Sequence, residues 1–453
     1  MLAKIVYLAL TSRLLVFLLQ VICNWIVPDH DADAFRRPTA PPSSNVVTYL
    51  FGGFAHWDAE YFLHIAEHGY TYENTLAFFP LYPHLVRCIT DSVLDPLLCI
   101  LLPYQSVLLL SGVLLNVFMF TIAAIALYHL TLILFDETAA MEATLLFCFN
   151  PASVFFSACY TESLFSATTF LGLYLLEFGQ ECLATVFFIL GGFVRSNGFL
   201  SSGFLIFHTF IKWSQPWQSG CELVVKTGAR VALCFAPYLL FQCYTWSLYC
   251  IPDRSVEHSD AVLQQASEHG YHLAGYNISE WCKNVLPFSY GYVQQKYWNV
   301  GFLRYYQLKQ LPNFLLATPV VALLGSACFH FLKRNSKTFF PIRWKPGQGV
   351  AAEVRRLPYL LHVCILLTLC TLFVNVQVTT RLVAASSPVL YWATFLILDH
   401  HPARGAAVLL KGKWHQQLRV LWRTDFLRRR VLTFFALYFV LGTAMHVNRL
   451  PWT

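Results

Sequence analysis

Charged residues are scarce in this chain: Asp, Glu, Lys and Arg make up only 12% of its 453 residues, whereas 57% of the residues are hydrophobic. A soluble globular protein carries about 25% charged residues. Half that share over this length leaves too few ionised side chains to cover a surface that faces water. The composition excludes an ordinary soluble protein and predicts a polytopic membrane protein.

Cysteine pairs with metal or redox spacing are also missing. The 14 cysteines contain no C-x-x-C pair, and most of them lie inside apolar runs, where a cysteine is usually a small buried hydrophobe. This pattern argues against a zinc site or a dithiol redox motif. The net charge of +7 does not indicate nucleic acid, because the basic residues lie in short loops between apolar segments, as the positive-inside bias predicts.

Long apolar runs, by contrast, recur along the whole chain. A membrane-crossing helix needs about 20 apolar residues, and we expect about eleven such helices. The segment 182–194 is short and is a candidate for a broken or re-entrant helix. The first apolar run is too long for a signal peptide and is interpreted as a retained span. The expected spans are 5–27, 106–135, 139–157, 163–178, 182–194, 198–213, 228–250, 311–332, 357–375, 382–398 and 431–447.

Two basic segments predict the orientation of these spans. Residues 333–356 and 400–430 are rich in Lys and Arg and poor in acids, which places both segments in the cytoplasm. Counting spans back from them puts the two long loops, 28–105 and 251–310, on the lumenal face. Asn277 begins the only N-x-S/T sequon and lies in the second of these loops, so we expect it to be glycosylated.

The first long loop contains the stretch "FAHWDAEYFLHIAEHGY", in which acids and histidines stand among aromatic residues. In a helix, His56, Glu60 and His64 would share one face. Three interpretations are open. The stretch is an interfacial helix whose polar face is solvated, or a metal site made by these three side chains, or the location of a catalytic carboxylate at the membrane edge.

Four further polar islands fall on the same predicted face: "NPASVFFSACYTES", "RSNG", "NVQVTTR" and "KYWNVGF". An isolated arginine at the end of a span is usually an interfacial anchor. Arg195 and Arg381 are more suggestive, because no acidic residue is near either of them in the sequence and a phosphate could neutralise them. Four polar islands joined to apolar spans on one face indicate a single site for a lipid with a charged head group.

These islands resemble a known family. The strings "HWDAEYFLHIAEHGY", "FFPLYP", "NPASVFFSACYTES", "RSNG", "YWNVGFLRYYQLKQLPNFLLATP" and "NVQVTTRLVAASSP" are similar to the PIG-V family of GPI mannosyltransferases, in order from about residue 50 to 395. The resemblance implies an all-α polytopic membrane protein with the GT-C type of glycosyltransferase fold. It also implies that dolichyl-phosphate mannose is the donor, and that a one-mannose GPI precursor receives the second mannose in α1,6 linkage.

The same resemblance implies roles for particular residues. Enzymes of this fold keep an acidic motif in the first lumenal loop, which makes Asp58 and Glu60 the candidate catalytic residues, with Asp58 preferred as the base of an inverting displacement. Arg195, Arg381 or Lys296 would supply positive charge to the departing dolichyl phosphate. Neither a metal nor a cofactor is expected. The expected substrate-binding residues are His56, Trp57, His64, Glu67, Asn150, Tyr160, Glu162, Arg195, Asn197, Lys296, Trp298, Asn299, Gln377 and Arg381.

Two alternative functions are kept. One is another GT-C transferase that uses a lipid-linked sugar, and the other is a polytopic lipid transporter, which should place polar residues near the middle of its spans. The expected partners are the two lipid-linked substrates and the endoplasmic reticulum membrane, with no nucleic acid. The sequence neither requires nor excludes a small membrane partner subunit. We expect a multi-pass protein of the endoplasmic reticulum with a lumenal active site.

Overall fold

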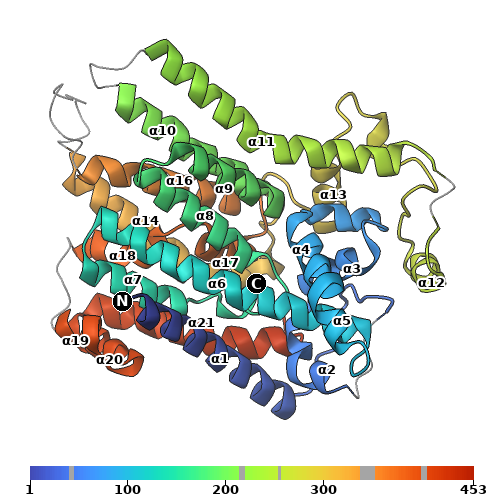
Figure 1. Cartoon of the computed structure of the whole chain (residues 1–453), viewed down its shortest axis with the longest axis horizontal. Coiled ribbons are helices and arrows are strands. Elements are labelled where there is room, and N and C mark those ends of the chain that lie inside the picture. The colour runs from blue at the N-terminus through green and yellow to red at the C-terminus, as the bar shows by residue number, and fades with distance from the viewer. Residues whose placement is uncertain (40–44, 214–219, 254–256, 337–351, 399–405, 453) are drawn as a thin grey trace.

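The computed structural model describes residues 1–39, 45–213, 220–253, 257–336, 352–398 and 406–452. Within these ranges the chain forms helices and connecting segments, and no strand occurs beyond one isolated antiparallel bridge between Tyr72 and Leu273. Most of the long helices lie side by side across the molecule (Figure 1). The all-α fold predicted from the sequence is confirmed.

Six of the described helices are long and apolar enough to cross a membrane, and a pair bent by 84° would add a seventh span. The multi-pass architecture is therefore confirmed, while the expected total of about eleven spans stays a prediction. The six long helices are α1 (Leu2–Ile26), α6 (Tyr104–Leu134), α11 (Gly220–Cys250), α14 (Leu311–Arg334), α16 (Ala352–Leu372) and α21 (Phe426–Val447). The bent pair is α17 (Thr379–Ser386) and α18 (Val389–Leu398).

Four shorter apolar helices account for the difference in number. They form where the sequence predicted spans 139–157, 163–178, 182–194 and 198–213. One of them, α8 (Glu162–Glu177), is buried along most of its length. The chain between α7 and α8 is also buried, so α7 ends and α8 begins inside the protein instead of at its surface. They are α7 (Glu137–Cys148), α8 (Glu162–Glu177), α9 (Glu181–Val194) and α10 (Ser202–Trp213).

The two long loops lie at the same end of the molecule, and α19 and α20 lie at the opposite end (Figure 1). The loops contact each other through the Tyr72–Leu273 bridge and through a 3.0 Å ion pair between Glu73 and Lys296. That both loops lie on the lumenal face stays a prediction. Parts of the basic segments, residues 337–351 and 399–405, lie outside the described residues. The helices at the two ends are α2 (Val46–Phe51), α3 (Asp58–His68), α4 (Leu81–Ile89), α5 (Asp95–Leu98), α12 (Asp260–His269), α13 (Ser289–Trp298), α19 (Ala406–Lys411) and α20 (Trp414–Thr424).

Short helical turns connect these elements. The π turn η3 (Thr90–Leu94) joins α4 to α5. The 3₁₀ turns are η1 (Gly52–Ala55), η2 (Glu73–Ala77), η4 (Ser153–Phe156), η5 (Ser196–Ser201), η6 (Glu280–Lys283), η7 (Leu308–Gln310) and η8 (Val376–Val378).

A disulfide closes the second long loop. Cys250 at the end of α11 is bonded to Cys282 in η6, with 5.5 Å between the Cα atoms. The sequence analysis expected most of the cysteines to be buried hydrophobes, and this pair is an exception. The signal that could have identified it is positional, because Cys250 borders and Cys282 lies within a loop assigned to the lumen, where disulfides persist.

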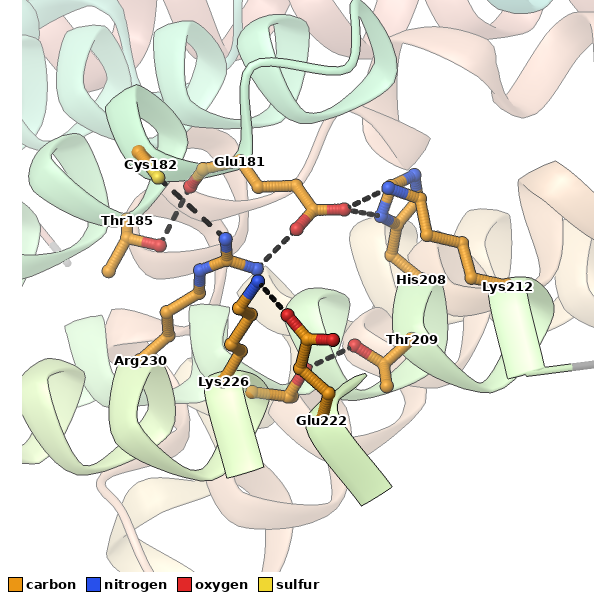
Figure 2. A network of polar contacts seen from close by, with 10 residues as sticks. Glu181, Cys182, Thr185, His208, Thr209, Lys212, Glu222, Lys226 and Arg230 are labelled. Atoms are coloured by element: carbon orange, nitrogen blue, oxygen red, sulfur yellow. Dashed lines mark hydrogen bonds and ion pairs between the residues drawn. The ribbon is translucent and has the colours of Figure 1, made fainter. Parts of the chain in front are cut away.

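A cluster of ion pairs fixes α9, α10 and α11 to one another. Figure 2 shows the carboxylate of Glu181, at the start of α9, between His208 and Lys212 of α10 and Arg230 of α11. The Nδ1 atom of His208 lies 3.2 Å from Oε1 of Glu181. The opposite end of α9 lines the cavity described next, so this cluster holds the helices of one cavity wall together at a distance from the cavity itself.

Candidate active site

A cavity of about 880 Å³ lies among the first long loop, α13 and the inner ends of α8 and α9. This volume is sufficient for a small-molecule ligand or a lipid head group. Its polar lining includes Asp58, Glu162, Arg195, Asn197, Gln377 and Arg381. Much of the remaining wall is apolar and includes Phe235 and Leu239 of α11 and Leu366 and Leu369 of α16. The cavity therefore combines paired charges with a surface suited to a hydrocarbon chain.

Asp58 and Arg381 form the first ion pair of the cavity. Asp58 is the first residue of α3, and its Oδ2 lies 2.7 Å from Nη2 of Arg381 in α17. The guanidinium group of Arg381 also faces the rings of Phe155 and Tyr160, at 5.2 and 5.5 Å from their centroids. Within the described part of the chain, no hydrogen bond reaches Oδ1 of Asp58, and its side chain is 26% exposed. One carboxylate oxygen thus remains accessible to a ligand.

The backbone that leads into Asp58 is strained. Trp57 has φ 61° and ψ −127°, a conformation that costs a non-glycine residue about 1–3 kcal/mol and occurs mainly where function requires it. The hydroxyl of Tyr160 accepts a hydrogen bond of 3.1 Å from the backbone N–H of Asp58. The same hydroxyl lies 3.4 Å from the carbonyl oxygen of His56 and donates to it. Tyr160 therefore holds the turn that presents Asp58 to the cavity.

Buried hydrogen bonds fix the segment 150–161 that carries Tyr160. Arg13 of α1 donates to the carbonyl oxygens of Ser153 and Cys148 at 2.7 and 3.1 Å. Asn116 of α6 donates to the carbonyl oxygens of Ala158 and Tyr160. A segment with this little regular structure is tolerated inside a membrane protein only when such partners satisfy its backbone. These contacts explain why polar residues occur between two strongly apolar helices.

Glu162 and Arg195 form the second ion pair. Glu162 begins α8 and is buried, and its Oε1 lies 2.8 Å from Nη1 of Arg195 at the end of α9. The sequence showed no acidic residue near Arg195 or Arg381, and the structure supplies carboxylate partners that are distant in the chain. Glu162 pairs with Arg195, and Asp58 pairs with Arg381. Both arginines nevertheless line the cavity, as the phosphate-binding prediction requires.

Three other expected binding residues also line the cavity. Asn197 donates to Oγ of Ser386 at 3.3 Å, and Gln377 accepts a 2.8 Å hydrogen bond from the hydroxyl of Tyr305. Trp298 lies at the end of α13, with its ring 5.8 Å from that of Phe78. The structure thus brings together residues from all four polar islands and the first loop.

The other candidate carboxylate, Glu60, does not reach the cavity. Its Oε2 lies 2.8 Å from Nε of Arg37, and the two side chains are only 7% and 1% exposed. The neighbouring His64 is also buried, with its Nε2 atom 2.7 Å from the hydroxyl of Thr71. The prediction that this face of the helix meets water is therefore wrong. Among the described residues, no cluster of three or more His, Cys, Asp or Glu side chains could hold a metal ion.

His56 precedes α3 and is buried outside the cavity. Burial, together with the nearby positive charge of Arg449, lowers the pKa of His56 to about 3. Burial also holds the pKa of His64 well below its ordinary value. Both rings are therefore neutral in the folded protein, and neither of them supplies positive charge to a ligand.

The remaining expected binding residues have structural roles outside the cavity. Glu67 accepts a hydrogen bond of 2.9 Å from Gln105. The side-chain oxygen of Asn150 accepts a hydrogen bond of 2.8 Å from the N–H of Ala152 and so closes a turn after α7. Asn299 has φ 52° and ends α13. Trp57 lies beside the site without lining it, which leaves Asp58 as the residue of the "WDAE" motif that the cavity contacts.

Lys296 is also placed away from the cavity. Its ammonium group lies 3.0 Å from Oε2 of Glu73, which also accepts a hydrogen bond from Tyr297. Burial lowers the pKa of Lys296, but hydrogen bonds with Tyr292 and Glu73 outweigh it, so the pKa is raised overall. Lys296 therefore links the two long loops and does not line the cavity.

Sequence reasoning missed most of the apolar wall and one structural arginine. Phe235, Leu239, Leu366 and Leu369 lie in ordinary hydrophobic helices, where no sequence pattern distinguishes a cavity wall from a lipid-facing surface. Arg37 lies near a proline-rich stretch and showed no feature that connected it to Glu60. The rule that a buried acid needs a cationic partner could have prompted the search for one.

Comparisons with known proteins agree along the whole chain. A family model described as "Mannosyltransferase (PIG-V)" matches residues 2–453. The mouse (Mus musculus) protein named GPI alpha-1,6-mannosyltransferase 2 is 38% identical, covering 98% of this chain and 97% of its own. The Drosophila pseudoobscura pseudoobscura protein named GPI mannosyltransferase 2 is 37% identical with 100% of both chains covered. The human (Homo sapiens) GPI alpha-1,6-mannosyltransferase 2 is 36% identical over 98% of this chain and 97% of its own.

A solved structure is also similar in backbone arrangement. The oligosaccharyltransferase of Archaeoglobus fulgidus, in a crystal structure with a tethered acceptor peptide, aligns with a TM-score of 0.46 at 12% sequence identity. The alignment covers 98% of this chain and 55% of that chain.

Proposed function

The chain belongs to the PIG-V family of mannosyltransferases, which acts in GPI-anchor synthesis, and we propose that it transfers mannose from dolichyl-phosphate mannose to the first mannose of the GPI precursor in α1,6 linkage. The observation that carries this proposal is the cavity, in which Asp58, Arg195 and Arg381 meet beside an apolar wall. A donor made of a sugar, a phosphate and a hydrocarbon chain needs these three kinds of surface together.

Asp58 is the proposed general base. The oxygen not engaged by Arg381 would take the proton from the 6-hydroxyl of the acceptor mannose, while that hydroxyl oxygen forms a bond to C1 of the donor mannose. The bond between C1 and the phosphate oxygen breaks in the same step. Because the donor is β-linked and the product α-linked, a single displacement with inversion accounts for the stereochemistry. Glu60 has no part in this step, since it pairs with Arg37 outside the cavity.

Arg381 and Arg195 are the proposed phosphate-binding residues. The leaving dolichyl phosphate departs as an anion and needs positive charge instead of a proton. Each guanidinium is fixed in advance by one carboxylate, at 2.7 and 2.8 Å respectively. A group that is already oriented loses little conformational freedom when it binds phosphate, and it can make paired hydrogen bonds. No cofactor is needed in this scheme, because the arginines supply the charge that the leaving group requires.

The proposed location is the lumenal side of the endoplasmic reticulum membrane. Two observations on the same end of the molecule support it. Cys250 and Cys282 are joined in a disulfide, which is typical of an oxidising compartment, and Asn277 of the sequon in the same loop is exposed. The cavity opens beside this loop, since Tyr290 and Trp298 of α13 contribute to its lining.

The test uses purified protein in proteoliposomes with radiolabelled dolichyl-phosphate mannose and the one-mannose GPI precursor. We expect a labelled two-mannose product from which an α1,6-specific mannosidase releases the added mannose. Asp58→Asn protein should form this product far more slowly. Transfer of sugar only to a different lipid acceptor would replace the proposal with the related transferase activity. Movement of a fluorescent lipid across the bilayer without any sugar transfer would indicate the transporter.

A further inference from the structure

Glu162 is a buried carboxylate that the proposed reaction leaves without a role. It is only 1% exposed, it begins the 16-residue helix α8, and it lines the same cavity as Asp58. Its Oε1 atom lies 2.8 Å from Nη1 of Arg195. Its Oε2 atom is buried and has no hydrogen-bond partner among the described residues. A buried carboxylate oxygen without a hydrogen-bond partner is costly unless a ligand completes it.

Another buried acid of the chain shows what a purely structural carboxylate looks like here. Glu73 has both oxygens engaged, since Oε1 accepts from Trp281 at 3.2 Å and Oε2 from Lys296 and Tyr297. Glu142 also leaves one oxygen without a partner among the described residues, but it does not line the cavity. Glu162 thus combines an unpaired oxygen with a position at the proposed substrate site.

The chemistry of this oxygen restricts what can bind to it. A carboxylate oxygen accepts hydrogen bonds and repels a phosphate, so its ligand must donate a hydrogen bond. In the proposed reaction the groups that enter the cavity are a phosphate, a hydrocarbon chain and sugars, and only the sugars offer hydroxyl donors. The other oxygen of Glu162 contacts Arg195, a proposed ligand of the donor phosphate. The sugar attached directly to that phosphate therefore comes closest to Glu162.

We propose that Oε2 of Glu162 accepts a hydrogen bond from the 2-hydroxyl of the donor mannose and so selects the sugar that is transferred. The 2-hydroxyl is on the carbon next to C1, which carries the phosphate, and it is the group whose orientation distinguishes mannose from glucose. A hydrogen bond to this hydroxyl also strengthens as charge develops at C1 during displacement. This inference rests on the proposed function and adds a specificity-determining residue to it.

The experiment compares two synthetic donors, dolichyl-phosphate mannose and its 2-deoxy analogue, in the mannose-transfer assay with proteoliposomes. For the wild-type protein we expect kcat/KM to be about 10- to 150-fold lower with the deoxy donor, the range for a hydrogen bond to a charged group. The ratio of kcat/KM for the normal donor to kcat/KM for the deoxy donor measures the discrimination. In Glu162→Gln, where a neutral amide replaces the carboxylate, this ratio should fall to about 2- to 10-fold. Glu60→Gln is the control, since Glu60 is also buried and also paired with an arginine but lies outside the cavity. Its ratio should equal that of the wild type.

The outcomes separate this inference from the proposed function. Equal use of both donors by the wild type, or undiminished discrimination by Glu162→Gln, would overturn the role of Glu162 while mannose transfer itself stands. The same comparison can be made with a normal and a deoxy acceptor. If Glu162→Gln lost discrimination between these two acceptors but not between the two donors, Glu162 would be assigned to the acceptor sugar and the donor assignment would be overturned. If the wild type transferred no mannose from the unmodified donor, the proposed function would fail and this inference with it.

Discussion

The carboxylate of Asp58 and the guanidinium of Arg381 lie 2.7 Å apart, although 323 residues separate them in the chain. The proposed base and a proposed phosphate ligand are thus held in one ion pair. Their separation is fixed before either substrate arrives, which is the preorganisation that makes electrostatic catalysis effective.

Replacing Asp58 by Asn removes the proton acceptor and keeps the shape of the side chain. We expect mannose transfer to fall by about 10²–10⁴-fold, the usual cost of losing a general base, at an unchanged amount of folded protein. The measurement is the transfer rate of membranes with matched protein level. Glu60→Gln is the control. It should reduce the amount of folded protein, because breaking a buried ion pair costs about 3–5 kcal/mol, with near-normal transfer per folded molecule. If Asp58→Asn protein were active and Glu60→Gln protein inactive, Glu60 would be the base and Asp58 would not.

Replacing Arg381 by Lys retains the positive charge and loses the planar fork. We expect the KM for dolichyl-phosphate mannose to rise, less in Arg381→Lys than in Arg381→Ala or Arg195→Ala, because only the guanidinium can bind both phosphate and Asp58 with paired hydrogen bonds. Steady-state kinetics with varied donor measures this. Lys296→Ala should change the donor KM far less, since Lys296 pairs with Glu73 outside the cavity. A larger rise in the donor KM for Lys296→Ala than for Arg381→Ala or Arg195→Ala would instead indicate that the donor phosphate binds beside α13.

Tyr160→Phe removes one hydroxyl and leaves the ring against Arg381. The N–H of Asp58 then loses its 3.1 Å partner, and an unsatisfied buried donor costs about 1–3 kcal/mol. We expect kcat to fall about 5- to 100-fold with little change in either KM. Tyr249→Phe removes a comparable buried hydroxyl that bonds to the carbonyl oxygen of Tyr70 at 3.1 Å, away from the cavity, and should leave kcat near the wild-type value. An equal loss in both variants would mean that the hydroxyl of Tyr160 contributes only to stability.

The buried histidines should make the protein sensitive to acid. Burial lowers the pKa of His56 to about 3 and that of His64 well below its ordinary value, whereas an unfolded histidine has a pKa of about 6.5. Between these values the unfolded chain binds protons that the folded chain does not, so stability falls as the pH drops below about 6.5. Thermal unfolding in detergent across this range measures how the midpoint temperature depends on pH. His56→Gln should weaken this pH dependence, whereas His84→Gln, at an exposed position, should not. A wild-type midpoint that does not depend on pH would contradict this prediction.

The orientation can be tested at two sites at opposite ends of the molecule. We expect Asn277 to carry a glycan that peptide N-glycosidase removes, and Cys250 and Cys282 to migrate as a disulfide without reductant. A cysteine placed at exposed Lys413 should react with an impermeant reagent in intact microsomes, identified by peptide mapping because the chain has other cysteines. Labelling of Lys413→Cys only after permeabilisation would invert the orientation.

The sequence was sufficient for the helices and for most of the cavity's polar residues. Hydrophobic runs located the helices because apolar length is a local property, and 228–250 indeed lies within α11. The polar islands converged because each interrupts an apolar run at a helix end. The family resemblance then selected Asp58 and Glu60 from among many acids, and the structure places only Asp58 at the cavity.

Pairing across the chain could not be predicted in the same way. Periodicity correctly put Glu60 and His64 on one face of a helix, but it could not tell whether that face meets water or protein. Arg37 and Thr71 decide this by tertiary contact. The arginines seemed unneutralised because only sequence neighbours were considered, whereas Asp58 and Glu162 approach them through folding.

The long separation of Asp58 and Arg381 has a consequence for how the enzyme is made. A ribosome adds about 5–20 residues per second, so roughly 15–65 s pass between the synthesis of Asp58 and that of its partner 323 residues later. Throughout that interval the nascent chain carries a carboxylate at the bilayer edge without its guanidinium, beside a cavity that lacks α16 and α17. We therefore expect the transferase to be inactive during its own biogenesis, because the proposed site is complete only when nearly the whole chain has been inserted.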